Sequence, residues 1–218
     1  MATAAPIEAV FWDNDGVLVD TEHLYMRATR EVMAARGAGL SEAQYVEWFL
    51  RQNRGILHFA ELHGWSASEV AVMREARNDR YGELLRSEPL VIDGVDEVLS
   101  ALHGRVRMAI VTSSRREHFD IIHAASGLLP YFDFVLADGD YAASKPHPAP
   151  YLAAIERTRL APANCLVVED SERGLRSAIA AGLPCVVIPS RLTMGEAFPG
   201  ALRVLSSVRN VVGIVDGR

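Results

Sequence analysis

Lysine is almost absent from this chain. Lys145 is the single lysine among 22 basic residues, and every other basic residue is an arginine. A lysine carries a compact point charge, whereas an arginine carries a bulky planar fork, so the two are not interchangeable in a confined space. The lysine in Ser144-Lys145-Pro146 therefore indicates a small, crowded pocket that a guanidinium would not fit. The alternative is one surface lysine retained by chance.

Cysteine, long apolar runs and an excess of positive charge are lacking as well. The two cysteines, Cys165 and Cys185, fall in expected buried strands, which is typical of a reduced, cytoplasmic protein rather than of a disulfide scaffold. No apolar run approaches the roughly 20 residues that span a bilayer, and residues 1–6 lack the features of a signal peptide. The net charge of −6 argues against nucleic-acid binding. We therefore expect a cytoplasmic protein with no nucleic-acid and no membrane partner.

Two carboxylates directly follow an apolar run at residues 7–12 that predicts a buried strand. In the stretch Asp13-Asn14-Asp15-Gly16, residues i and i+2 of an extended segment point the same way, so Asp13 and Asp15 are expected to face one pocket. Carboxylates held close together repel each other and raise one pKa unless a cation lies between them. The pattern favours a divalent metal site, an acid–base pair, or both. The alternative is a simple turn, for which Asn-Asp-Gly is well suited.

A second pair of acids, Glu169 and Asp170, follows a second apolar run in the same way. After this pair come a helical pattern that ends at Gly182 and a further apolar run at residues 185–188. Together they indicate a β-α-β unit, and hence a parallel sheet. Functional groups gather outside the carboxyl ends of the strands in such sheets.

A third apolar run, at residues 108–111, ends in Thr112-Ser113-Ser114. Hydroxyl groups and free backbone N–H groups at a strand end suit a phosphate oxygen. Helix capping by Ser113 or Ser114 is an equally good interpretation of the same residues.

The segment between Thr21 and Pro89 is helical by pattern and contains no strand-like run. Ser41-x-x-Gln44 and Ser66-x-x-Glu69 are capping boxes that mark the beginnings of two of its helices. The pattern predicts helices near residues 22–36, 41–52, 56–63 and 67–86. They would form a small bundle inserted between the first strand and the rest of the sheet.

These features resemble the four ordered motifs of the haloacid dehalogenase-like superfamily: Asp13 with Asp15, Thr112, Lys145, and Glu169 with Asp170. Any one motif is weak, but four in the right order at strand ends are specific, and they cover most of the chain. Asp15 separates the chain from the true haloacid dehalogenases, which lack this acid. The resemblance is with the group that includes phosphoglycolate phosphatase and β-phosphoglucomutase.

The resemblance implies an α/β fold with a doubly wound, mostly parallel, Rossmann-like sheet. The core domain would comprise residues 1–20 and 89–218, and residues 21–88 would form an α-helical cap that closes over the active site. It also implies roles for the motif residues. Asp13 attacks phosphorus and forms an aspartyl-phosphate, and Asp15 serves as acid and then as base.

The remaining motif residues would hold the phosphoryl group and a metal ion. Lys145, Thr112 and Ser113 would bind phosphate oxygens. By the family pattern, the metal ligands are Asp13, the backbone carbonyl of Asp15, Asp170, and Glu169 either directly or through water. A set of oxygen ligands that retains waters favours Mg²⁺.

We therefore expect a Mg²⁺-dependent phosphatase of a small phosphorylated metabolite, such as a sugar phosphate or a phosphoglycolate-like compound. Arg54, in a loop expected between two helices, is the candidate for a contact with a substrate anion. The sequence predicts no oligomeric state.

Two other functions are compatible with parts of the pattern. A phosphomutase of the β-phosphoglucomutase kind is the first, but those enzymes carry a histidine twelve residues after the nucleophile, where this chain has Tyr25. A phospho-accepting receiver domain is the second and more remote one, because receivers are much shorter and carry no cap.

Overall fold

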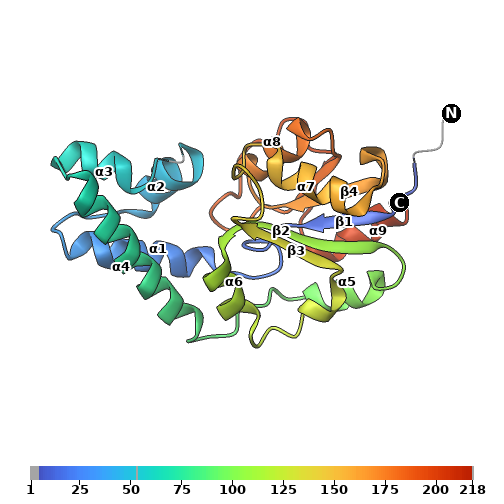
Figure 1. Ribbon diagram of the computed structural model, residues 1–218, viewed down its shortest axis with the longest axis horizontal. Helices are drawn as coiled ribbons and strands as arrows, with labels where there is room; N and C mark the ends of the chain where they lie inside the picture. Colours follow the sequence, from blue (N-terminus) through green and yellow to red (C-terminus); the bar gives the residue numbers. More distant parts are fainter. Residues whose placement is uncertain (1–4, 53, 218) are drawn as a thin grey trace. The chain divides into compact units, whose positions relative to one another are not determined.

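The computed structural model describes residues 5–52 and 54–217, and the chain divides into two compact units. One unit joins the residues up to Asp20 with those from Leu90 onward, and the other is the continuous segment Thr21–Pro89. The first unit contains the sheet, and the second is helical (Figure 1). The predicted α/β fold with a helical segment inserted after the first strand is confirmed. In the described ranges, no helix is long and apolar enough to cross a membrane.

Six parallel strands form one sheet in the order β3-β2-β1-β4-β5-β6. The strands are β1 (Ala9–Trp12), β2 (Arg107–Arg115), β3 (Phe134–Asp138), β4 (Cys165–Glu169), β5 (Cys185–Val187) and β6 (Arg203–Val204). The chain fills one side of β1 with β2 and β3 and then crosses to the other side for β4. The carboxyl ends of β1 and β4 therefore meet at the point where the strand order reverses, which is where open α/β sheets form their crevice.

Helices cover both faces of the sheet. They are α5 (Val95–Leu102), α6 (Arg116–His123), α7 (Ala149–Thr158), α8 (Glu172–Ala180) and α9 (Val211–Val215), with short 3₁₀ turns at Leu129–Tyr131, Pro162–Asn164 and Val208–Asn210. Figure 1 shows α7 and α8 on one side of the sheet and α5 and α6 on the other. Phe11 and Val167 from the sheet pack with Tyr151 of α7 and Leu175 of α8 in one fully buried cluster.

Strand β2 is longer than the apolar run at residues 108–111 predicts. It continues through the hydroxyl residues to Arg115, and the register with β3 shifts between Val111 and Arg115. Helix α6 then begins at Arg116 with no side-chain cap. The capping interpretation of Ser113 and Ser114 is therefore wrong, because both residues belong to the strand and Arg115 is the residue that precedes α6.

The helical unit contains α1 (Glu22–Ala34), α2 (Glu42–Tyr45), a π-helical segment η1 (Val46–Arg51), α3 (Ile56–His63) and α4 (Ala67–Leu85). Both predicted capping boxes are present in full, with each serine accepting a backbone N–H and each partner side chain accepting the serine N–H. Helix α3 has the predicted bounds, and α4 ends one residue before the predicted end.

The predicted helix over residues 41–52 is present, but its second half is not α-helical. After Tyr45 the helix widens into a π-helical segment, and the carbonyl of Trp48 accepts the N–H groups of both Arg54 and Gly55 at 2.9 Å. The ring of Trp48 also packs on His58 and Phe59 of α3, with centroids 4.2 and 5.0 Å away. This packing depends on residues that lie outside the helix, so local propensity does not reveal it.

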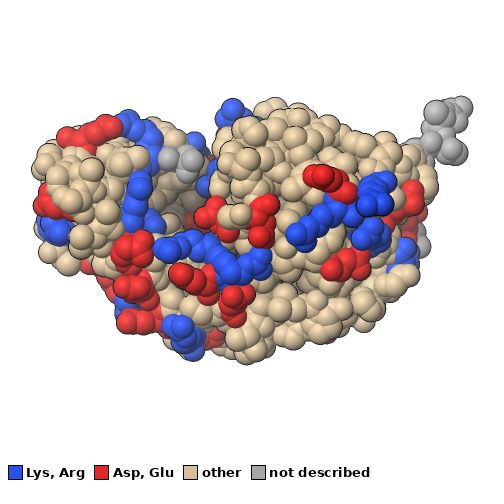
Figure 2. Space-filling view, in the orientation of Figure 1, with Lys and Arg blue, Asp and Glu red and all other residues tan. Residues whose placement is uncertain are grey.

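Arginines form ion pairs on the surface, whereas the single lysine is buried. On the face shown in Figure 2, basic and acidic groups lie next to one another rather than in patches of one sign. Exposed pairs such as Arg107 with Asp133, at 3.1 Å, and Arg116 with Asp140, at 2.5 Å, are typical of the sheet unit. Such pairs are worth about 0–1 kcal/mol each. Lys145 is only 4% exposed, which excludes the interpretation of a chance surface lysine.

Candidate active site

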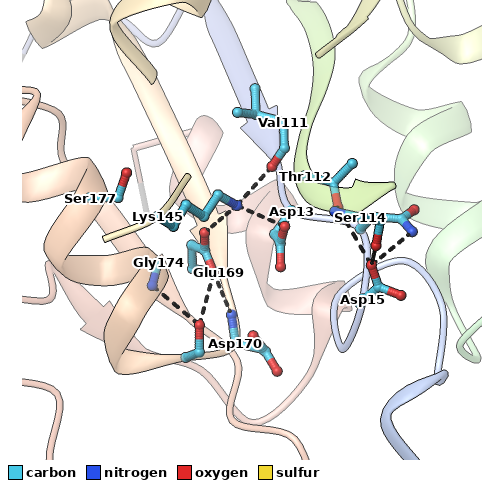
Figure 3. A network of polar contacts seen from close by, with 12 residues as sticks. Asp13, Asp15, Val111, Thr112, Ser114, Lys145, Glu169, Asp170, Gly174 and Ser177 are labelled. Carbon is cyan, nitrogen blue, oxygen red and sulfur yellow. Dashed lines mark hydrogen bonds and ion pairs between the residues drawn. The ribbon is translucent and has the colours of Figure 1, made fainter. Parts of the chain in front are cut away.

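Lys145 lies at the centre of a buried polar network at the switch point of the sheet (Figure 3). Its Nζ donates to Asp13 Oδ1 at 2.7 Å, to Glu169 Oε1 at 2.7 Å and to the carbonyl oxygen of Val111 at 2.8 Å. An ammonium group has three donors, and all three are used. Burial alone would lower the pKa of Lys145, but Asp13 and Glu169 more than offset this effect and raise it, so the side chain stays charged.

Both carboxylate oxygens of Glu169, the last residue of β4, accept hydrogen bonds from the protein. Its Oε1 accepts the hydroxyl of Tyr151 at 2.6 Å as well as Lys145, and its Oε2 accepts the backbone N–H of Asp170 at 3.3 Å. The side chain is completely buried. Burial and the nearby Glu169 charge raise the pKa of Tyr151 well above its usual value, so this phenol stays protonated and continues to donate.

Helix α8 begins directly against this carboxyl group. A Cβ atom at Gly174 would lie 1.9 Å from the carboxyl carbon of Glu169. Only glycine lets the first turn of the helix approach so closely, which adds to the confinement of Glu169. Ser171 caps the same turn by accepting the N–H of Gly174 at 3.2 Å.

Asp13, the first residue after β1, is buried beside a second carboxylate. Burial, together with the charge of Glu169, raises the pKa of Asp13 to about 7, although Lys145 acts in the opposite direction. A carboxylate in this state is more basic than usual, and an added cation would stabilise its ionised form. The crowding predicted between Asp13 and Asp15 contributes least to this shift, which comes mainly from burial and from Glu169.

Carboxylate oxygens of Asp13, Glu169 and Asp170 lie within 4.8 Å of one another and could hold a metal ion. The loop after β1 comes close to this cluster, because a Cβ atom at Gly16 would lie 2.2 Å from Asp170 Oδ2, and Gly16 has a φ of +84°. The donor set consists of oxygen atoms alone, which suits a hard divalent cation such as Mg²⁺. The residues present therefore fit the ion that the motifs predict.

Asp15 lies on the other side of Asp13 from Lys145 (Figure 3). Its Oδ2 accepts the hydroxyl of Ser114 in a short hydrogen bond, the side-chain amide of Asn14 at 3.3 Å and, more weakly, the hydroxyl of Thr112 at 3.5 Å. Thr112 also accepts the backbone N–H of Ser114 at 3.0 Å. The two acids of the first motif thus have different partners, one a cation and the other neutral donors.

Ser113 lies between these two residues on β2. Its hydroxyl oxygen is buried and makes no hydrogen bond of good geometry to the described part of the chain. Tyr141 fixes the backbone here by donating to the carbonyl of Thr112 at 2.6 Å. Buried polar groups are nearly always hydrogen-bonded, so a hydroxyl that makes no hydrogen bond of good geometry is suited to a ligand oxygen.

The structure brings together all but one of the predicted site residues. The side chains of Asp13, Asp15, Thr112, Glu169 and Asp170 gather at the carboxyl ends of β1, β2 and β4, and Lys145 reaches them from the loop after β3. Ser113 follows Thr112 on β2. Arg54 belongs to the helical unit, where it is half-exposed and pairs with Glu61. Its predicted contact with a substrate anion stays a prediction, as do the individual roles of the others.

Sequence reasoning missed three residues of this network: Tyr151, Ser114 and His123. Tyr151 lies 18 residues before Glu169, on a helix that reads simply as apolar. The sequence pattern groups Ser114 with its neighbours as a phosphate ligand or a helix cap, whereas its hydroxyl donates to Asp15. His123 contacts Asn14, which is 109 residues away in the sequence, and no short sequence pattern predicts a pair so far apart.

Comparison with known proteins agrees with this geometry. The sequence pattern of the haloacid dehalogenase-like hydrolases matches residues 7–182. The chain belongs to this family and is a hydrolase. The match covers both acidic motifs and the inserted helices, which removes the receiver-domain alternative.

The chain is similar along most of its length to several described proteins. Protein CbbY of Rhodobacter capsulatus is 34% identical and covers 89% of this chain and 91% of its own. The fructose-1-phosphate phosphatase YqaB of Escherichia coli is 30% identical, with 81% of this chain and 94% of YqaB covered. A crystal structure of a CbbY variant from Rhodobacter sphaeroides in complex with xylulose-(1,5)bisphosphate has a TM-score of 0.80 at 28% identity, covering 93% of this chain and 95% of that one.

Proposed function

We propose that this protein is a Mg²⁺-dependent phosphatase that hydrolyses a small phosphorylated metabolite through an aspartyl-phosphate on Asp13. The observation that carries the proposal is the state of Asp13, a buried carboxylate with a pKa raised to about 7 and with Lys145 on its Oδ1 at 2.7 Å. Such a carboxylate is a good nucleophile once its charge and that of the substrate are balanced. The relatives named above support a sugar phosphate as substrate.

Each residue of the site has a separate role in the two steps of the proposed reaction. A carboxylate oxygen of Asp13 forms a bond to phosphorus as the bond to the leaving oxygen breaks, and Asp15 gives that oxygen a proton. In the second step Asp15 takes a proton from water, which attacks phosphorus and releases phosphate from Asp13. Lys145 and donors from Thr112 and Ser113 would stabilise the charge on the phosphoryl oxygens in both steps.

The metal ion would be held by Asp13, Asp170 and the backbone carbonyl of Asp15, with Glu169 bound directly or through water. When bound, Mg²⁺ supplies positive charge against the phosphoryl oxygens. We propose further that the helical unit acts as the cap, with residues 21–88 as its extent and Arg54 as a candidate for an anion contact. Such caps close over the bound substrate and exclude bulk water from the site.

The substrate class and the nucleophile are tested together. Phosphate release is measured with Mg²⁺ on fructose 1-phosphate, xylulose 1,5-bisphosphate, phosphoglycolate and nucleotides, for the parent chain and for Asp13→Asn. We expect release from a sugar phosphate by the parent and its loss in the variant, whose fold is checked by circular dichroism. Near-parent activity of Asp13→Asn, or an acyl-phosphate trapped on another residue, would contradict the proposal.

A phosphomutase is the second candidate, because the cap carries Arg77-Asn78-x-x-Tyr81, which resembles the cap of β-phosphoglucomutases. The position of their histidine is occupied by Tyr25, whose ring packs edge-on against Tyr81 at 5.1 Å and under Arg77 at 4.7 Å. A phenol does not titrate near neutral pH as an imidazole does, so we propose that hydrolysis prevails.

The two activities differ in their products. A ³¹P NMR time course with β-glucose 1-phosphate and a trace of the 1,6-bisphosphate follows inorganic phosphate and glucose 6-phosphate together. We expect inorganic phosphate to accumulate faster. Faster formation of glucose 6-phosphate would establish the mutase instead.

A further inference from the structure

A buried histidine is connected to the acid–base motif by hydrogen bonds. His123 is the last residue of α6, and its Nε2 lies 2.8 Å from Asn14 Oδ1, whereas its Nδ1 lies 2.9 Å from the hydroxyl of Ser126. Asn14 is completely buried and His123 is 5% exposed. Neither residue belongs to the four motifs, although Asn14 stands between Asp13 and Asp15.

The protonation of this pair follows from its surroundings. Burial lowers the pKa of His123 to about 4, although the charges of Asp15 and Asp120 act in the opposite direction. The ring is therefore neutral near pH 7 and carries one N–H. Because the Oδ1 of Asn14 only accepts, that N–H is on Nε2, and Nδ1 accepts the hydroxyl of Ser126.

All donors in this chain of hydrogen bonds point toward Asp15. The backbone N–H of Leu128 donates to Ser126 at 3.1 Å, Ser126 to His123, and His123 to Asn14. The amide nitrogen of Asn14 then donates to Asp15 Oδ2 at 3.3 Å. A carboxylate only accepts, so the order of donors is consistent from one end to the other.

His123 thereby determines which way the amide of Asn14 faces. The main chain of Asn14 is already fixed, because its carbonyl accepts the N–H groups of Leu18 at 2.8 Å and Val19 at 3.1 Å. Its side-chain amide is held by two hydrogen bonds, the long one to Asp15 at 3.3 Å and the shorter one from His123 at 2.8 Å. With the amide rotated by half a turn, Oδ1 would face the carboxylate of Asp15, and two acceptors would repel each other.

We propose that His123, acting through Asn14, is a positioning residue that holds the carboxyl group of Asp15 for proton transfer to the leaving oxygen. This inference rests on the proposed phosphatase function. In this step Asp13 forms a bond to phosphorus, the bond between phosphorus and the leaving oxygen breaks, and the proton of Asp15 moves to that oxygen. A displaced carboxyl group gives up its proton poorly, which matters most when the leaving oxygen is strongly basic.

This dependence on the leaving group distinguishes positioning from simple packing. His123 also contacts the ring of Phe119, with centroids 4.3 Å apart, so a purely structural role would lower stability and affect all substrates equally. Loss of positioning would spare substrates whose leaving group needs no proton. A nitrophenolate is such a group, and a sugar alkoxide is not.

The test compares kcat/KM for p-nitrophenyl phosphate, phenyl phosphate and fructose 1-phosphate in the full chain with Mg²⁺. For His123→Phe we expect a loss of about 10-fold to 100-fold on fructose 1-phosphate, less on phenyl phosphate, and under about 3-fold on p-nitrophenyl phosphate. His118→Phe is the matched control, since His118 is also buried on α6, at 7% exposed. We expect equal effects on all three substrates there.

Two further variants connect the effect to Asn14. His123→Gln retains an N–H donor near the position of Nε2 and should recover most of the loss on fructose 1-phosphate. Asn14→Leu should show the same dependence on the leaving group, and the double variant with His123→Phe should lose little more than either alone. Ser126→Ala removes only the hydrogen bond between the Ser126 hydroxyl and Nδ1 of His123. If His123→Phe does not fold, kcat/KM of Ser126→Ala on the three substrates is compared instead.

The outcomes separate this inference from the function on which it rests. Equal losses on all three substrates in His123→Phe, or additive losses in the double variant, would overturn the positioning role and leave the phosphatase intact. A parent chain inactive on every phosphate monoester would overturn the phosphatase proposal and this inference with it.

Discussion

The ammonium group of Lys145 reaches three oxygen atoms within 2.8 Å while the residue is 96% removed from solvent. A buried ion pair gains little net stability, but removal of one partner leaves an uncompensated charge. Asp13, Glu169 and Lys145 therefore depend on one another. The small size of the lysine ammonium group is therefore what allows Lys145 to lie between Asp13 and Glu169.

Lys145→Arg should abolish most activity although it retains the positive charge. The planar guanidinium is larger than the space between Asp13 and Glu169, and a displacement of about 1 Å at a reacting group costs on the order of 100-fold in rate. The measurement is kcat/KM for the best substrate of the panel, with the exposed Arg203→Lys as control. Activity above about half that of the parent would contradict the confined pocket.

Asp170→Asn should weaken Mg²⁺ binding more than Glu169→Gln does. Both oxygens of Glu169 already accept hydrogen bonds from the protein, whereas Asp170 lies at the partly exposed edge of the acidic cluster. We expect a loss of affinity of about 10-fold or more for Asp170→Asn, measured by calorimetry. Equal losses in the two variants would indicate that Glu169 binds the ion directly.

Among the elements, α8 is the one that most closely confines the site. Its first turn is capped by Ser171 and presses Gly174 against the carboxyl group of Glu169. The strand β4, this turn and Lys145 thus support one another, and the position of the helix is part of the catalytic geometry.

Gly174→Ala should destabilise the protein although alanine favours helix by about 1 kcal/mol. A Cβ atom 1.9 Å from the carboxyl carbon of Glu169 would push this side chain away from Lys145 and Tyr151. We expect a lower free energy of unfolding in urea and a loss of activity. Gly213→Ala in α9 is the matched control, because a Cβ atom there meets nothing within 4 Å; it should be neutral or slightly stabilising.

For the whole molecule, the raised pKa of Asp13 couples stability to pH and to metal. The carboxyl group holds its proton more tightly in the folded chain, at about 7 against 3.8, so its contribution to the free energy of unfolding is complete at low pH. Without metal, that contribution is lost as the pH rises through about 7. Metal binds the ionised form and should reverse the loss.

The rise in Tm produced by a fixed concentration of Mg²⁺ should therefore be larger near pH 8 than near pH 5. Differential scanning fluorimetry at both pH values, with and without EDTA, measures it. Asp13→Asn removes the titrating group and should show a smaller rise that hardly changes with pH. A rise independent of pH in the parent would mean that Asp13 is not a ligand.

Local sequence patterns are enough to predict the class of the fold, the inserted helices and the motif residues. The capping boxes at Ser41 and Ser66, and the acids that follow β1 and β4, depend on neighbours within a few residues, and such local chemistry can be read without a structure. The single lysine was informative for the same reason, since composition alone set Lys145 apart.

Which of these groups contact one another depends on the folded arrangement of the chain. Tyr151 on Glu169, Gly174 against the same carboxyl group, and His123 on Asn14 each join segments that are brought together by sheet register and helix packing. The π-helical segment after Tyr45 arises in the same way, from Trp48 packing on the next helix. Such contacts form only when the whole chain packs, because many interactions between distant segments together fix their positions. A pattern of neighbouring residues therefore does not predict them.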